Sequence, residues 1–167
     1  MAQQDESLPR AARRVAEALS ARGHNGEIRI LSDSARSAAE AAAALGVAQE
    51  QIVKSMVFRG RSSGQAILAL VGGLSRVDTA LLAAFAGEAV ERADADWVRE
   101  QTGFAIGGVP PVGHGDGVRT VAERSLVPFP LLWAAAGTPH AVFPLRGDEL
   151  VELTGAELAS IASADGR

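Results

Sequence analysis

Lys54 is the only lysine among 16 basic residues, and the other 15 are arginines. It stands in the β-prone run 52–58 (IVKSMVF), where alternate side chains share a face. Its neighbours on that face, Ile52 and Met56, are apolar. We therefore expect Lys54 at the edge of a pocket, where its ammonium group meets an anionic ligand. The alternative, an outward-pointing residue of a half-buried strand, fits this alternation poorly.

A second candidate is the segment 107–117 (GGVPPVGHGDG), which is too rich in glycine and proline for a helix or strand. Three interpretations are open. The segment is an ordinary surface loop, or it is a phosphate-binding loop, although the lysine-serine ending of a P-loop is missing. In the third, Pro110 and Pro111 hold a ring of backbone N–H groups that binds a carbonyl oxygen as it gains negative charge.

The three histidines, His24, His114 and His140, are too scattered for a local metal-binding spacing, so metal catalysis is not expected. His24 lies in a turn cluster and is expected to be exposed. His114 lies in the glycine-proline loop and His140 opens a strand, so either a ligand contact or a structural role is open for each. The absence of cysteine excludes thiolate chemistry, and no GxSxG nucleophile elbow is present.

The elements that position these residues follow from hydrophobic spacing and from glycine, proline and capping residues. The predicted caps are Ser34, Ser75, Asp94 and Thr154, the last in a capping box with Glu157. The predicted helices are 8–22, 35–45, 76–86, 95–102, 148–153 and 154–161. The predicted strands are 27–31, 52–58, 65–71, 88–93, 118–121, 131–136 and 140–145. The order of these elements indicates an α/β fold.

Length and charge narrow the function classes. A chain of 167 residues with 47% hydrophobic residues is expected to form one soluble domain, 1–167. The net charge of −4 argues against coating nucleic acid or a membrane through a bulk positive field, so any nucleic-acid contact must be local. Arg59, Arg61 and Arg119 are candidates for such a local patch, or simply solubilising residues. With no apolar span or leader, the expected location is the cytoplasm.

Read together, IVKSMVF, SRVD, TGF followed by GGVPPVG, and WAAAGTPHAVF resemble the YbaK/ProX family of aminoacyl-tRNA editing domains. The resemblance covers about residues 26–161, behind the N-terminal helix 8–22. It implies a single α/β domain with a mixed, curved, barrel-like sheet flanked by helices. The family's strand lysine, functionally essential there, matches Lys54. The first glycine of its G-G-x-x-P loop, whose N–H binds the substrate carbonyl, matches Gly107, and Gly108, Pro111 and Gly113 match the rest of that motif.

The resemblance implies a hydrolase that removes a wrong amino acid from tRNA, without cofactor or metal, while contacting only the acceptor end. Lys54 and Gly107 are the implied catalytic residues, and water activation is open among the ribose hydroxyl, a backbone carbonyl, His114 and His140. A prolyl-tRNA synthetase is a candidate partner, and no membrane partner is expected. The residues expected to bind substrate are Gly108, Val109, Pro110, Pro111, Gly113, His114, Ala135, Gly137, Thr138 and His140.

The sequence departs from the cysteine-specific branch of that family. It contains no tyrosine, and Ala135-Ala136-Gly137 stands where that branch has serine-glycine-glycine. Loss of these polar groups favours alanine or another small residue on proline tRNA as the substrate, with serine and threonine still open. The alternatives are a deacylase for cysteine on proline tRNA, a general small-ester hydrolase, and a catalytically silent module that binds a synthetase or the acceptor end.

Overall fold

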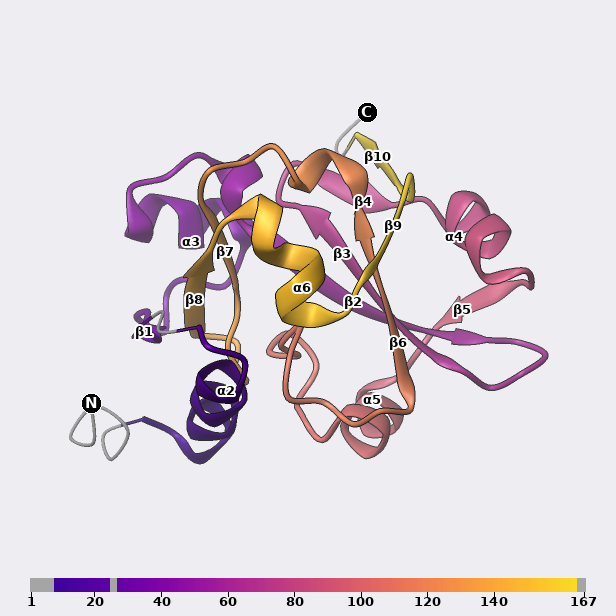
Figure 1. Cartoon of the computed structure of the whole chain (residues 1–167), viewed down its shortest axis with the longest axis horizontal. Coiled ribbons are helices and arrows are strands. Elements are labelled where there is room, and N and C mark those ends of the chain that lie inside the picture. Colours follow the sequence, from indigo (N-terminus) through magenta and orange to yellow (C-terminus); the bar gives the residue numbers. More distant parts are fainter. Residues whose placement is uncertain (1–7, 25–26, 165–167) are drawn as a thin grey trace.

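The structure is a computed structural model that describes residues 8–24 and 27–164. Figure 1 shows its helices and strands. The helices are α2 (Arg10–Ala21), α3 (Ala38–Leu45), α4 (Thr79–Ala86), α5 (Ala95–Thr102) and α6 (Leu150–Thr154), with single 3₁₀ turns η1 (Gln49–Gln51), η2 (Arg124–Leu126) and η3 (Gly147–Glu149). The strands are β1 (Arg29–Ile30), β2 (Val53–Gly60), β3 (Ala66–Gly72), β4 (Ser75–Val77), β5 (Val90–Arg92), β6 (Val118–Glu123), β7 (Leu132–Ala135), β8 (Ala141–Leu145), β9 (Glu157–Ala159) and β10 (Ala162–Ala164).

The central sheet has five strands in the order β5-β2-β3-β6-β9. The predicted hairpin of β2 and β3 is antiparallel, with Lys54 opposite Val71, whereas β3–β6 and β6–β9 are parallel. Residues 66–71 of β3 are all buried, which explains their unbroken apolar run, because a central strand covered on both faces does not alternate. The predicted α/β fold with a mixed sheet and flanking helices is confirmed, although the sheet stays open and does not close into a barrel.

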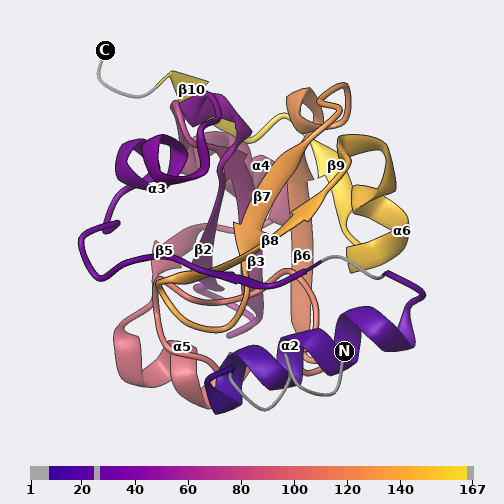
Figure 2. The same cartoon turned by 90° about the vertical axis from the view of Figure 1, so that its left-hand side faces the viewer.

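A second sheet brings distant residues beside the start of β2. Its order is β1-β8-β7, with β7 and β8 antiparallel. An isolated parallel bridge between Ile52 and Trp133 joins the edge of this sheet to β2. Figure 2 shows β7 and β8 passing in front of the central strands, with α3 at one side and α2 below. Lys54, just after Ile52, therefore lies where the two sheets meet.

Helix ends follow capping rules, but three of the four predicted caps, Ser34, Ser75 and Thr154, are wrong. Helix α3 begins after Ser37, whose hydroxyl accepts a hydrogen bond from the Glu40 N–H, and not after Ser34. Ser75 belongs to β4, and Asp78 caps α4 instead. The reason is the pairing of β4 with β10, which holds Ser75 in an extended conformation. Asp94 caps α5 as predicted.

The predicted helix 154–161 is wrong. Thr154 is the last residue of α6, its hydroxyl donates to the Leu150 carbonyl, and Gly155 ends the helix with a φ of +72°. The chain then forms β9, which pairs with β6. The buried carboxylate of Glu123 accepts hydrogen bonds from the N–H groups of Ile161 and Ala162, so the last segment is held extended against the sheet.

No helix in residues 8–24 or 27–164 is long and apolar enough to cross a membrane.

Candidate functional site

A cavity of about 340 Å³ lies between α3, the start of β2 and the second sheet. Most of its wall is apolar and comes from segments far apart in the sequence. The polar and charged side chains among its lining residues are Arg36, Ser37, Lys54 and Ser55. No aspartate or glutamate of the described chain is among them, so the site is suited to an anionic ligand with a small apolar portion.

Lys54 lies at the edge of this cavity, as the alternation of its strand predicts. It is half-buried near the start of β2, and its neighbours Ile52 and Met56 also line the cavity. Val71 of β3 is its partner in the register. A lysine charge beside an apolar chamber is less screened by water than one on an open surface.

Gly107 faces the same cavity from the glycine-proline loop. Its φ is +86°, a conformation that favours glycine, and a Cβ there would lie 3.8 Å from Cγ of Pro139. Within the described residues, no hydrogen bond uses the Gly107 N–H. The next residue is held firmly, because Gly108 donates to the Ala105 carbonyl and accepts from the Gly137 N–H, both at 3.0 Å. A fixed backbone with an unused N–H is what binding of an oxyanion requires.

The remainder of the predicted loop site does not reach the cavity. Val109 and Pro110 are buried in the core region. Pro111, Gly113 and His114 line a separate polar cleft with Arg22 and Arg119. The sequence placed all of this loop near the substrate because it is continuous in the chain, but only Gly107 of residues 107–117 lines the cavity with Lys54.

The end of β7 and the turn between β7 and β8 supply residues to two separate pockets. Ala135 lines the Lys54 cavity, whereas Gly137 and Thr138 line a neighbouring cleft, and Pro139 borders both. His140 is not among the residues lining either one. Its Nε2 lies 4.0 Å from the exposed carboxylate of Asp33, and its backbone N–H donates to the Thr138 hydroxyl.

Three buried polar atoms have no hydrogen-bond partner among the described residues: Ser55 Oγ and Trp133 Nε1, whose residues line the cavity, and His140 Nδ1, whose residue does not. Trp133 and the wall of α3, with Ala38 and Ala41, are site residues that the sequence interpretation missed. The tryptophan stood within the matched WAAAGTPHAVF motif. The alanine wall had only a weak signal, since small residues on a short helix are usual in cores.

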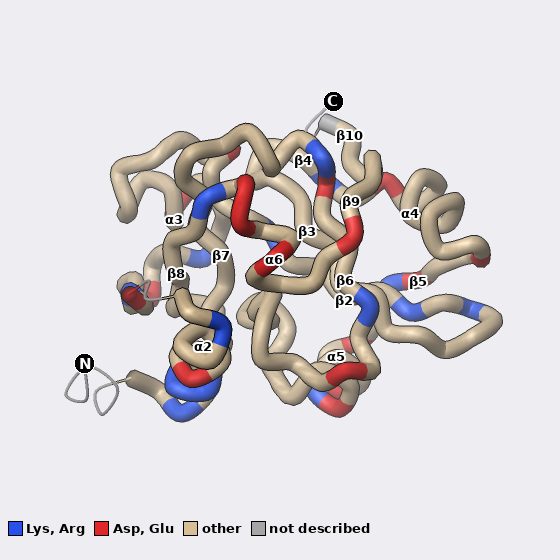
Figure 3. Tube along the Cα trace, in the orientation of Figure 1, with Lys and Arg blue, Asp and Glu red and all other residues tan. Residues whose placement is uncertain are grey.

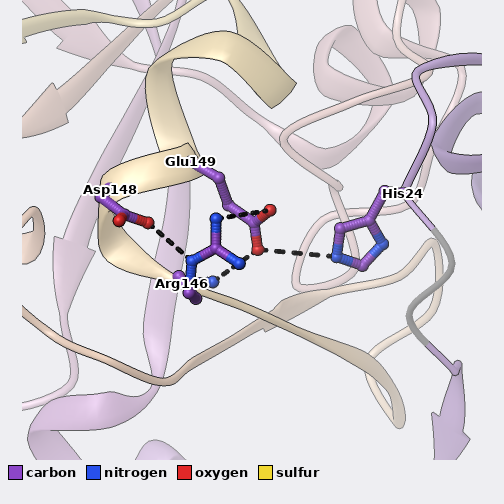
Figure 4. Close-up of polar contacts among 4 residues, drawn as sticks. All are labelled: His24, Arg146, Asp148 and Glu149. Atoms are coloured by element: carbon purple, nitrogen blue, oxygen red, sulfur yellow. Dashed lines mark hydrogen bonds and ion pairs between the residues drawn. The ribbon is translucent and has the colours of Figure 1, made fainter.

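His24 is not exposed, contrary to the sequence prediction. Its side chain is only 9% exposed, and its ring packs edge-on against Phe143 at 5.8 Å. Figure 4 shows its Nε2 directed toward Glu149, 3.9 Å away. Glu149 also accepts from the Arg146 N–H, and the hydrogen bond from the Arg146 side chain to Asp148 raises the arginine's pKa. This cluster fixes the C-terminal helix and lies apart from the cavity.

The predicted arginine patch does not form near Lys54. The Arg119 side chain makes two hydrogen bonds to Glu157, which raise the pKa of Arg119 and lower that of Glu157. Arg61 lies 3.6 Å from the carboxylate of Glu91. Arg59 lies over the ring of Trp97. Two of these three guanidinium groups are therefore paired with carboxylates.

The architecture is that of an aminoacyl-tRNA editing domain. The chain belongs to this family, whose model matches residues 32–153. A solved structure of a candidate trans-editing enzyme for prolyl tRNA synthetase superposes with a TM-score of 0.88 at 44% identity, covering 95% of this chain and 100% of that one.

Two curated proteins are similar to parts of this chain. The uncharacterized protein YwhH of Bacillus subtilis is 31% identical over 115 residues, 69% of this chain and 73% of that protein. The proline–tRNA ligase of Thermosipho africanus is 34% identical over 99 residues, 59% of this chain. That match spans only 17% of the ligase, so it concerns one part of a much larger protein.

Proposed function

We propose that this protein is a trans-editing hydrolase that removes alanine, or another small amino acid, from mischarged proline tRNA. The observation that carries the proposal is that Lys54 and Gly107 line one largely apolar cavity. Membership of the editing family and the likeness to a candidate prolyl-tRNA trans-editing enzyme support it. The protein acts without a cofactor or metal and contacts the acceptor end of the tRNA.

In this mechanism Lys54 binds the phosphate or ribose end of the terminal adenosine through a charge-assisted hydrogen bond. A water oxygen attacks the ester carbonyl carbon, and the Gly107 N–H stabilises the negative charge on the carbonyl oxygen. The bond from this carbon to the ribose oxygen then breaks, and the ribose oxygen takes the proton that the attacking water gives up. The products are the free amino acid and tRNA with its hydroxyl restored.

The positions of the histidines favour assistance by the substrate. His114 lines a different cleft, and His140 is not among the residues lining the cavity. A general base must come within hydrogen-bond reach of the proton it removes, directly or through one water. The free hydroxyl of the terminal ribose is next to the ester in every aminoacyl-tRNA. We therefore assign it the task of orienting and activating the water.

The walls of the cavity favour a small amino acid. Ala135, Trp133 and Met56 line it, and no carboxylate of the described residues is present to pair with a basic side chain. A rigid apolar chamber excludes side chains that are too large more sharply than it rejects smaller ones. Alanine is therefore the preferred group, and proline, the correct amino acid, is expected to react more slowly.

The test is a deacylation time course with proline tRNA charged separately with alanine, cysteine, serine and proline. We expect selective loss of alanine, reduced about 10- to 100-fold in kcat/KM by Lys54→Ala and unaffected by a chelator. Faster loss of cysteine would replace alanine by cysteine as the substrate. Binding without hydrolysis of any charged tRNA would identify a silent module. If Lys54→Ala cleaved simple esters as fast as the wild type does, the protein would be a general ester hydrolase.

A further inference from the structure

The neighbouring cleft has a composition that the editing chemistry alone does not explain. Its volume is about 490 Å³, and Arg10, Arg14 and Arg99 all line it. No aspartate or glutamate of the described residues is among its lining residues. In a chain with net charge −4, three arginines gathered without a carboxylate create a strong local positive field. Figure 3 shows blue segments following one another along α2.

The arginines come from two helices, α2 and α5, that both line the cleft. Arg10 and Arg14 are four residues apart on α2, so their side chains project from the same face of the helix, opposite the buried Ala12, Val15 and Leu19. Arg99 stands in the last turn of α5. Ion pairs among the described residues involve none of these three side chains. Their charges are therefore available to a ligand.

The cleft is already in position and does not need to assemble. The guanidinium of Arg14 stacks on the Phe104 ring at 4.3 Å and donates to the Gly103 carbonyl at 3.0 Å. The β7–β8 turn approaches α2 so closely that a Cβ on Gly137 would lie 2.7 Å from the Ala11 carbonyl oxygen. Arg14 is thus held in one orientation, which reduces the entropy lost when an anion binds.

The cleft is continuous with the candidate active site. Pro139 borders both, and the segment that ends in Gly107 of the cavity supplies Phe104 and Ala105 to the cleft. A polynucleotide whose last nucleotide occupies the cavity would cross Pro139 and carry its preceding phosphates over the arginines. We infer that the Arg10–Arg14–Arg99 cleft binds the phosphodiester backbone of the single-stranded RNA end that precedes the esterified nucleotide. The identity of that RNA as tRNA rests on the proposed function.

The first experiment measures binding of uncharged proline tRNA across a series of salt concentrations, so that hydrolysis has no part in it. The variant is Arg10→Gln with Arg99→Gln, which leaves Arg14 and its packing in place. We expect roughly tenfold weaker binding and a slope of log K against log salt that is shallower by about 1.4, for two lost contacts to single-stranded phosphates. An unchanged affinity and slope would overturn the inference.

The matched control is Arg76→Gln with Arg124→Gln. Both side chains are exposed. The two substitutions remove the same charge from β4 and η2, and neither residue lines the arginine cleft. This control should bind as the wild type does, and an equal loss of affinity would mean that net charge alone is responsible. Unchanged circular dichroism and melting of both double variants would verify that neither is misfolded.

A second experiment locates the contact on the RNA. Removing the four 3′-terminal nucleotides from the tRNA should weaken binding to the wild type and abolish the difference between the wild type and the Arg10→Gln, Arg99→Gln variant. A difference that persists with the shortened tRNA would overturn the assignment to the acceptor end. Displacement of intact tRNA by millimolar inorganic phosphate would assign the cleft to a small free anion instead.

These measurements are independent of the proposed catalysis. If no charged tRNA is deacylated but the arginine-dependent binding is as expected, the proposed function fails and the RNA cleft stands. If deacylation proceeds and the double variant binds and reacts like the wild type, the cleft inference fails alone.

Discussion

At the scale of single residues, Lys54 and Gly107 differ in how far the sequence could predict them. Lysine on an apolar strand face already predicts a pocket edge, because a residue's place in a strand fixes the face on which it lies. The glycine-proline loop predicts an unusual backbone but not which of its amides faces the cavity. Only the folded chain separates Gly107, which lines the cavity, from Pro111, Gly113 and His114, which line another cleft.

The role of Gly107 can be tested by its positive φ. Gly107→Ala has room for the methyl group, but alanine at a φ of +86° is strained by about 1–3 kcal/mol, and relief of that strain turns the N–H away. We expect kcat to fall about 100-fold with little change in KM, the size observed when one oxyanion donor is lost.

Gly87→Ala is the matched control for this substitution. Gly87 has a φ of +77°, an added Cβ there meets nothing within 4 Å, and the residue ends α4 far from the cavity. It should lose comparable stability while keeping its activity. Similar losses of kcat in both variants would show that strain, and not the Gly107 N–H, is responsible.

At the scale of elements, local signals predicted most helices and strands. The predictions are wrong where contacts between residues far apart in the sequence determine the structure. Asp94 begins a helix and three glycines end α3, α4 and α5 through hydrogen bonds within one helical turn. Such local signals can be recognised in the sequence. Thr154 and Glu157 have the spacing of a capping box, yet pairing with β6 makes residues 157–159 extended. The carboxylate that holds this segment, Glu123, is 38 residues from Ile161, beyond the reach of any local pattern.

Glu123 should therefore be important for stability. It is 8% exposed and accepts hydrogen bonds from Ser125, Ile161 and Ala162 N–H groups. Glu123→Ala leaves these donors without a partner, and we expect the free energy of unfolding to fall by about 3 kcal/mol in urea denaturation. Glu152→Ala, on the exposed side of α6, should change it by less than about 0.5 kcal/mol. Equal losses would mean that Glu123 does not hold the C-terminal segment.

The stability of the protein should fall at acidic pH in part because of Glu88, which binds the turn of the β2–β3 hairpin. The Ser63 hydroxyl and the N–H groups of Ser63 and Ser62 donate to its carboxylate and lower its pKa below 4.5. Because the folded pKa is depressed, the stabilisation is present above the unfolded pKa and is lost as pH falls through the folded value. The melting temperature of Glu88→Gln should therefore decline less between pH 6 and pH 3 than that of the wild type, and parallel declines would contradict this origin.

At the scale of the whole molecule, the cavity is lined by elements that are far apart in the sequence and that few backbone hydrogen bonds connect. The central sheet, the second sheet and α3 each supply a wall. Among residues 8–24 and 27–164, the isolated Ile52–Trp133 bridge is the one pairing that connects the two sheets. A ligand in the cavity contacts all three and binds only the folded chain. It should therefore stabilise the molecule as a whole and not one element.

A non-hydrolysable alanyl-adenosine amide tests this consequence without any turnover. At about 100 times its Kd, a ligand specific for the folded state adds about 2.7 kcal/mol, which corresponds to a rise in melting temperature of roughly 5–10 °C for a chain of this size. Lys54→Ala should lose most of the rise, and Arg76→Gln should keep it. The same rise in Lys54→Ala would place the ligand elsewhere. A rise in the wild type combined with no deacylation would separate binding from catalysis, since the cavity would then hold the aminoacyl end without cleaving it.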